Sequence, residues 1–181
     1  MASSLGGISA LTRVLSLLPA DFKAAIVIVQ HLWPAQRSHL ADLLNRNSAL
    51  TIRDAREGDL LQPATAYIAM PDRHVLLNLD GSLTLTDTDK VNFVRPSADR
   101  LFVTASQALK ERVIGVVLTG TGQDGTLGVQ AIKAEHGFVI AQDKATSKSF
   151  EMPKAAIATG MVDVCLPLDE IAATLVALLE G

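Results

Sequence analysis

The chain has 181 residues, of which 49% are apolar and 19% charged, with a formal net charge of −3. This is enough apolar material for the core of one globular domain, and the lack of a lysine and arginine run argues against nucleic acid or an anionic membrane surface as a partner. The single cysteine, Cys165, excludes an internal disulfide, and the apolar run before it predicts a buried thiol. The strongly apolar run at 24–29 is too short to cross a membrane, and no leader pattern follows Met1. We therefore expect a soluble, cytoplasmic protein with no direct membrane insertion.

Short apolar runs alternate with amphipathic helical patterns along the chain, which is typical of an α/β fold. In the first half of the chain, the patterns predict a helix at about 7–18, a buried strand at 24–30, a helix at about 36–45, a strand at 65–69 and an antiparallel hairpin turning at Asp80 and Gly81. The second half is predicted to begin with a helix at 97–110, with Ser97 as its N-cap, and a buried strand at 113–118. A helix at about 126–135, a strand at 138–142, a short helix near 153–158 and a closing helix at 168–180 complete the predicted elements. The expected architecture is three-layer α/β/α, with a doubly wound, mainly parallel sheet and a small antiparallel hairpin.

Three polar groups follow predicted strands or turns, at the strand ends where ligands bind in open parallel sheets. Ser3 and Ser4 lie in "MASSLGG", His31 follows "AAIVIVQ", and Asp124 lies in "TGTGQDG". Each has a plainer interpretation, since serine is a common helix N-cap and histidine often caps a strand. Together, however, a hydroxyl, an imidazole and a carboxylate are the set that a nucleophilic hydrolase requires.

The same glycine-rich loop also fits the fingerprint of a dinucleotide-binding domain. Gly120, Gly122 and Gly125 match G-x-G-x-x-G literally, and Asp143 lies 18 residues beyond the last of them. Against this alternative, Asp124 would place a negative charge where a pyrophosphate would lie. Too little chain also follows Asp143 to complete such a fold. Titration with NADH would test this alternative.

Several sequence blocks occur together, in order, over nearly the whole chain: "SSLGG", "IVIVQHL", "AYIAMPDRHVLL", "VNFVRPSADRLF", "VIGVVLTGTGQDGTLG", "AQD" and "MPKAAI". With these blocks the sequence resembles the catalytic domain of the CheB-type chemotaxis methylesterases. The resemblance implies Ser4 as nucleophile, His31 as general base and Asp124 as the acid that orients it. Backbone N–H groups of Thr121 and Leu5 are the candidate oxyanion donors. The family commonly has methionine at the position of Thr121, a change that a backbone donor survives.

The resemblance also implies an activity and partners. Members hydrolyse γ-glutamyl methyl esters on the cytoplasmic helices of chemoreceptors during chemotaxis adaptation, and some deamidate receptor glutamines. Neither a metal nor a cofactor is expected. The alternative is a non-catalytic or weakly active signalling module that docks on receptors, which a serine-directed fluorophosphonate would leave unlabelled.

Domain organisation follows from the same resemblance. Residues 1–181 are expected to form one methylesterase-type catalytic domain, without the receiver domain that often precedes it in relatives. Only Met1 and Ala2 precede Ser3, so we expect the first strand of the sheet to be truncated.

Four further residues stand out with weaker signals. Arg95, in "RPSAD", is a candidate contact for the substrate or for an acidic receptor surface, although a structural role in its loop remains open. His39, His74 and His136 lack the spacing of metal ligands. We predict that these three histidines are surface or capping residues.

Overall fold

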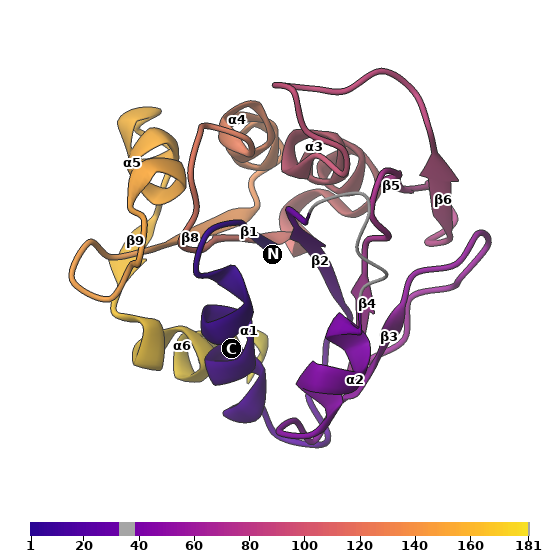
Figure 1. Cartoon of the computed structure of the whole chain (residues 1–181), viewed down its shortest axis with the longest axis horizontal. Helices are drawn as coiled ribbons and strands as arrows, with labels where there is room; N and C mark the ends of the chain where they lie inside the picture. Colours follow the sequence, from indigo (N-terminus) through magenta and orange to yellow (C-terminus); the bar gives the residue numbers. More distant parts are fainter. Residues whose placement is uncertain (33–38, 181) are drawn as a thin grey trace.

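The computed structural model describes residues 1–32 and 39–180 (Figure 1). A seven-stranded sheet runs through its middle in the order β3-β4-β2-β1-β7-β8-β9, and every adjacent pair is parallel. Its strands are β1 (Ala2–Ser3), β2 (Ile26–Gln30), β3 (Thr51–Asp54), β4 (Thr65–Ile68), β7 (Ile114–Val117), β8 (Phe138–Gln142) and β9 (Val164–Leu166). The predicted parallel α/β sheet is confirmed.

Helices cover both faces of the sheet (Figure 1). One face carries α1 (Gly7–Ser16), α2 (Leu40–Asn45) and α6 (Leu168–Glu180). The other carries α3 (Ala98–Leu109), followed by the 3-10 turn η1 (Lys110–Arg112), α4 (Thr126–Ala134) and α5 (Glu151–Ala158). Two separate apolar clusters fill the spaces between sheet and helices. The central strands are apolar throughout because both of their faces are buried.

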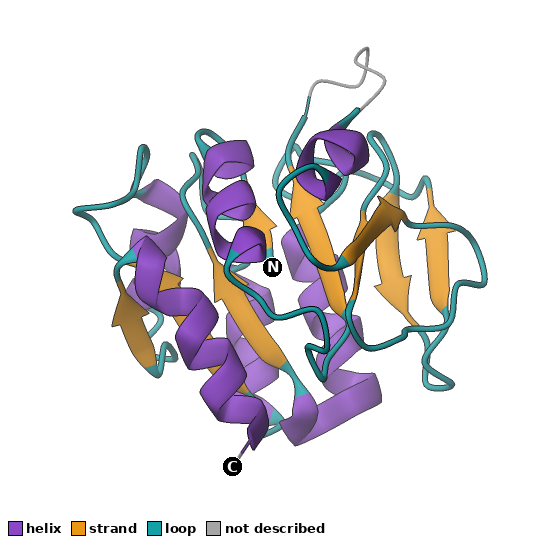
Figure 2. Cartoon of the chain, turned by 90° about the horizontal axis from the view of Figure 1, so that it is seen from below, coloured by secondary structure: helices purple, strands orange, loops and turns teal. Residues whose placement is uncertain are grey.

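A small antiparallel sheet lies beside the β3 and β4 end of the molecule (Figure 2). It consists of β5 (His74–Leu77) and β6 (Leu83–Thr86). Gly81, in the connecting turn, has a φ of +83°, a conformation that glycine adopts without strain. The predicted hairpin is therefore confirmed.

Local patterns misjudged several details. β3 and β9, at the two edges of the sheet, were not predicted as strands, because edge strands carry a weaker apolar signal. Cys165 was predicted to be buried but is exposed, since in edge strand β9 its side chain alternates with the inward-packed Val164 and Leu166. The start of the predicted helix at 36–45 lies outside the described residues. Within the described residues, every helix is too short or too polar to span a membrane.

Candidate active site

The site lies at the carboxyl ends of three central strands. β1 sits between β2 and β7, and the chain extends from this point towards both edges of the sheet. Loops diverge at such a switch point and leave a crevice above the strand ends. Ser4 follows β1, His31 follows β2, and the loop that carries Asp124 follows β7.

Ser3 and Ser4 have different environments, which local sequence patterns alone do not distinguish. The Ser3 side chain is fully buried, and its hydroxyl donates to Gln30 Oε1 at 2.7 Å. The Gln30 amide in turn donates to the backbone oxygens of Ser4 and His31, both at 2.9 Å. Gly7 is required beside this pair, because a Cβ there would lie 2.1 Å from Gln30 Oε1. Ser3 and Gln30 therefore brace the site, while Ser4 faces a cavity.

The turn that carries Ser4 is tied to the loop after β7. The Ser4 amide donates to Thr119 O at 3.0 Å, and the Thr119 hydroxyl donates to Leu5 O at 2.9 Å. Gly120 allows this close approach, because a Cβ there would lie 2.8 Å from Ser4 Cβ and 2.3 Å from Met152 Sδ. Gly120, the first glycine of the dinucleotide fingerprint, is thus explained by packing.

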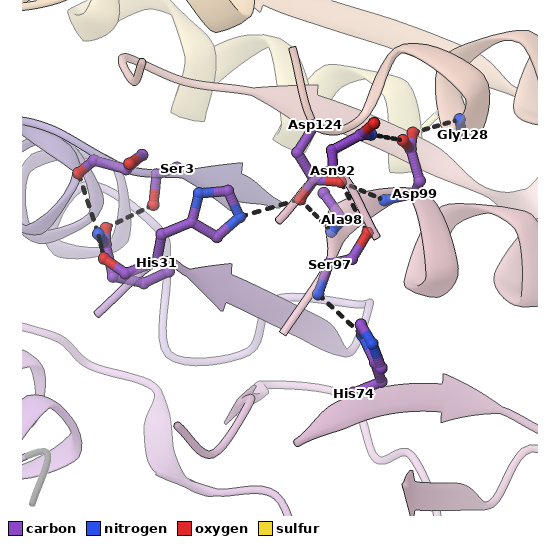
Figure 3. Close-up of polar contacts among 11 residues, drawn as sticks. Ser3, His31, His74, Asn92, Ser97, Ala98, Asp99, Asp124 and Gly128 are labelled. Atoms are coloured by element: carbon purple, nitrogen blue, oxygen red, sulfur yellow. Dashed lines mark hydrogen bonds and ion pairs between the residues drawn. The ribbon is translucent and has the colours of Figure 1, made fainter. Parts of the chain in front are cut away.

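His31 and Asp124 form a direct contact (Figure 3). Their atoms Nε2 and Oδ2 are 2.9 Å apart, and the side chains are 13% and 3% exposed. Asp124 also accepts hydrogen bonds from the Ser97 hydroxyl at 2.7 Å and from the amides of Ala98 and Asp99 at 2.6 and 3.2 Å. Because an ionised carboxylate only accepts, Nε2 of His31 carries the proton of their bond and Nδ1 is the nitrogen left to act as a base.

Asp124 also occupies the N-terminus of α3. Ser97 stands at the predicted N-cap position, but its hydroxyl makes no cap hydrogen bond and binds Asp124 instead. The Asp124 carboxylate, in place of the Ser97 hydroxyl, accepts from the first amides of the helix, where the helix dipole favours negative charge. Burial acts to raise the pKa of Asp124, but hydrogen bonds from His31, Ser97 and the Ala98 amide together hold this pKa below its usual value.

A second layer of buried polar groups supports this acid. Asp99 accepts from the Gly128 amide at 2.8 Å and from the Asn92 side chain at 3.1 Å, while burial raises its pKa. His74, predicted to be a surface or capping residue, is fully buried. Its Nδ1 accepts from the Ser97 amide and its Nε2 donates to Asp89 O, both at 3.1 Å. Burial lowers the pKa of His74, which favours the neutral ring that these two bonds require.

The cavity beside Ser4 has a volume of about 280 Å³ and is lined by Ser4, His31, Leu32, Lys90, Phe93, Val94 and Arg95. Arg95 reaches this wall, but much of its guanidinium is already engaged. Nε and Nη2 bind Asp72 Oδ1 at 3.0 and 2.8 Å, and Nη1 binds the backbone oxygens of Asp87 and Thr88. Its use as a substrate contact stays a prediction.

Two backbone amides next to this site are available as donors. Within residues 1–32 and 39–180, neither the Leu5 nor the Thr121 amide donates a hydrogen bond. The Thr119 contacts hold their two loops together. In the same part of the chain, no cluster of three or more metal-ligating side chains occurs.

The fold and the site together define a doubly wound α/β domain with a hydroxyl, an imidazole and a carboxylate gathered at its switch point. Comparison with known proteins places this arrangement in a family. The sequence model described as CheB methylesterase matches residues 1–175, and the chain belongs to this family. The crystal structure of the Thermotoga maritima CheB methylesterase catalytic domain superimposes with a TM-score of 0.94 at 39% identity, covering 98% of this chain and 95% of that one.

Curated relatives carry the name protein-glutamate methylesterase/protein-glutamine glutaminase. Those of Pyrococcus horikoshii and Moorella thermoacetica are each 41% identical to this chain and cover 99% and 100% of it. A Burkholderia orbicola relative is 43% identical over 98% of the chain. The chain spans about half the length of these relatives, namely 50%, 44% and 53%.

Proposed function

We propose that this chain is a serine hydrolase domain that removes methyl esters from glutamate side chains of chemoreceptors. The observation that carries the proposal is the contact of His31 with the buried Asp124, above a cavity that His31 shares with Ser4. The names of the relatives supply the substrate class. The glutaminase part of those names extends the proposal to deamidation, since both reactions are acyl transfers at the same side-chain carbonyl.

Ser4 is the proposed nucleophile. As its Oγ attacks the ester carbonyl, His31 Nδ1 takes the hydroxyl proton, and Asp124 stabilises the imidazolium that forms. Collapse of the tetrahedral intermediate breaks the bond to the methoxy group, which leaves as methanol with the proton from His31. Water then attacks the acyl-enzyme and gives a proton to His31. Collapse of the second tetrahedral intermediate breaks the bond to Ser4 Oγ, which takes that proton back from His31, and glutamate is released.

The negative oxygen of both tetrahedral intermediates requires preorganised donors. The Leu5 and Thr121 amides are the proposed pair, because both are without a hydrogen-bond partner in the described part of the chain. Removing a comparable donor in an acyl-transfer enzyme costs about 10²–10³ in kcat. These donors are backbone groups, so the threonine at position 121 is compatible with the role.

Substitution of Ser4 by alanine tests the assignment. We expect Ser4→Ala to abolish methanol release from a methylated receptor fragment and to prevent labelling by a fluorophosphonate. The thermal unfolding midpoint should stay close to that of the unsubstituted chain, because Ser4 lines a cavity.

Ser3→Ala is the matched control. It removes a buried hydroxyl one residue away and leaves Gln30 Oε1 without its donor, at a cost of about 1–3 kcal/mol of stability, but Ser4 remains reactive to fluorophosphonate. Full activity of Ser4→Ala would overturn the nucleophile assignment. A fully folded chain that shows neither labelling nor hydrolysis would favour the non-catalytic docking module.

A further inference from the structure

We propose that Glu151, in the first turn of α5, is a positioning residue that orients the Thr121 amide, the proposed oxyanion donor. This inference rests on the proposed function and deepens it, because it names the side chain that holds one donor of that site in place. Glu151 lines a groove with Gly122, Gln123 and Lys154, which is separate from the cavity beside Ser4. It therefore acts through the loop and does not contact the ester.

The loop that carries this donor has little backbone preference of its own. Thr121 lies between two glycines, Gly120 and Gly122, and glycine accepts a wide range of backbone conformations. Gly122 has a φ of +85°, and a Cβ built on it would meet no described atom within 4 Å. Packing does not hold the loop at this residue. The direction of the Thr121 N–H must consequently be set by hydrogen bonds from outside the loop.

The Gly120–Thr121 peptide is held through its carbonyl group. Gly120 O accepts from the Met152 amide at 2.9 Å and from the Ser149 hydroxyl at 3.1 Å. The peptide is trans, and in a planar trans peptide the N–H points opposite to the C=O. A carbonyl that faces the start of α5 therefore turns the Thr121 N–H away from α5. Because Gly120 lies against Ser4, this amide emerges beside the proposed nucleophile.

The next peptide, between Thr121 and Gly122, is held through its amide instead. The Gly122 N–H donates to Glu151 Oε2 at 2.8 Å. A carboxylate acceptor makes such a bond stronger than one between neutral groups, and the start of a helix favours the negative charge. With both flanking peptides held, neither φ nor ψ of Thr121 can change without breaking a hydrogen bond. Glu151 supplies the hold on the second side.

Glu151→Ala tests this role, because it releases the second peptide and removes only an exposed side chain. Loss of a whole oxyanion donor costs about 10²–10³ in kcat, so a loosened donor should cost about tenfold. KM for a methylated receptor fragment should stay nearly unchanged, since the donor acts mainly in the transition state. A small fluorophosphonate, which also forms a tetrahedral adduct at Ser4, should label the variant more slowly by the same factor. The pH profile should keep its position, because His31 and Asp124 are untouched.

Two further variants serve as controls. Glu151→Gln keeps an acceptor oxygen at the same reach and should recover most of the lost kcat. Glu57 is a matched residue far from the site, since its exposed carboxylate accepts the Leu85 amide at 2.7 Å in the antiparallel hairpin. Glu57→Ala should leave both kcat and the labelling rate unchanged.

The outcomes separate this inference from its alternatives. Unchanged kcat and labelling in Glu151→Ala would overturn it. So would a loss confined to KM with normal labelling, which would make Glu151 a receptor contact. If Glu151→Gln is as slow as Glu151→Ala, the charge matters and the hydrogen bond does not, which also overturns the inference. Methanol release that persists in Ser4→Ala defeats the proposed function itself, whereas Ser4-dependent release that is insensitive to Glu151→Ala removes only the role of Glu151.

Discussion

Asp124 accepts four hydrogen bonds, from His31, Ser97 and the amides of Ala98 and Asp99. A carboxylate has about four acceptor positions, so this acid is fully satisfied. A buried carboxylate whose acceptor positions are all occupied can neither rotate nor exchange partners without losing a hydrogen bond. At the residue scale, Ser97 is therefore a positioning residue that acts on His31 through Asp124.

Ser97→Ala tests this role. Loss of a hydrogen bond to a buried charge should reduce the free energy of unfolding by about 1.5–3 kcal/mol. It should also lower kcat more than it raises KM, because the hydroxyl does not face the cavity. The lost bond was one of those that lower the pKa of Asp124, so the acid limb of the pH profile should move to higher pH.

A second buried serine of α3 gives the control. Ser106 donates its hydroxyl to Val103 O of its own helix. Ser106→Ala should cost at most about 1 kcal/mol and leave the pH profile unchanged. An identical pH profile in Ser97→Ala and the unsubstituted chain would contradict the positioning role.

At the scale of elements, α3 and α4 hold the acid together. Both helices begin at the site, and the Gly128 amide at the start of α4 donates to Asp99 Oδ1 at the start of α3. The helices approach closely because residue 128 has no side chain. A Cβ there would lie 2.4 Å from Phe102 Cβ, below any ordinary contact distance.

Gly128→Ala should therefore separate the two helices. Alanine favours the helix by about 1 kcal/mol over glycine, but the overpacking costs about 1–3 kcal/mol, so we expect a net loss of stability. Activity should fall as Asp99 moves relative to Asp124. Chemical denaturation and ester hydrolysis measure both effects. The control is Gln130→Ala, on the exposed side of α4, which should change the free energy of unfolding by no more than about 0.5 kcal/mol. Unchanged stability and activity in Gly128→Ala would show that the contact between the helices relaxes freely.

At the scale of the whole molecule, His74 links the antiparallel hairpin to the start of α3. It lies on β5, accepts from the Ser97 amide and donates to Asp89 O. Protonation would remove the acceptor nitrogen and charge a fully buried ring. Folding therefore depends on a neutral His74.

This requirement predicts a pH dependence of global stability. The folded-state pKa of His74 is lowered by burial from the unfolded value of 6.5, so below that value the unfolded chain binds more protons than the folded one. Its contribution to stability is complete above about pH 6.5 and is lost as the pH falls towards the folded-state pKa. Urea denaturation at pH 7.5 and 5.5 measures the free energy of unfolding at both values. This free energy should fall less between pH 7.5 and 5.5 in His74→Gln than in the unsubstituted chain. Equal losses would show that His74 is not held neutral.

The sequence by itself determined the α/β class, the places of most helices and strands, and the three polar groups that follow β1, β2 and β7. These features could be predicted because apolar periodicity, β-branched runs and turn residues act over a few positions along the chain. The resemblance to the family also depends on such local blocks, and it singled out Ser4, His31 and Asp124 before any contact between them was known.

Only the tertiary structure decided which of these residues meet and what supports them. His31 and Asp124 are 93 positions apart, and their contact depends on β1 lying between β2 and β7. The bracing role of Ser3, the burial of His74 and the binding of Ser97 to Asp124 all involve partners more than 20 residues away. No local pattern encodes such partners, because a side chain's burial and bonding are set by elements that the chain brings together only on folding.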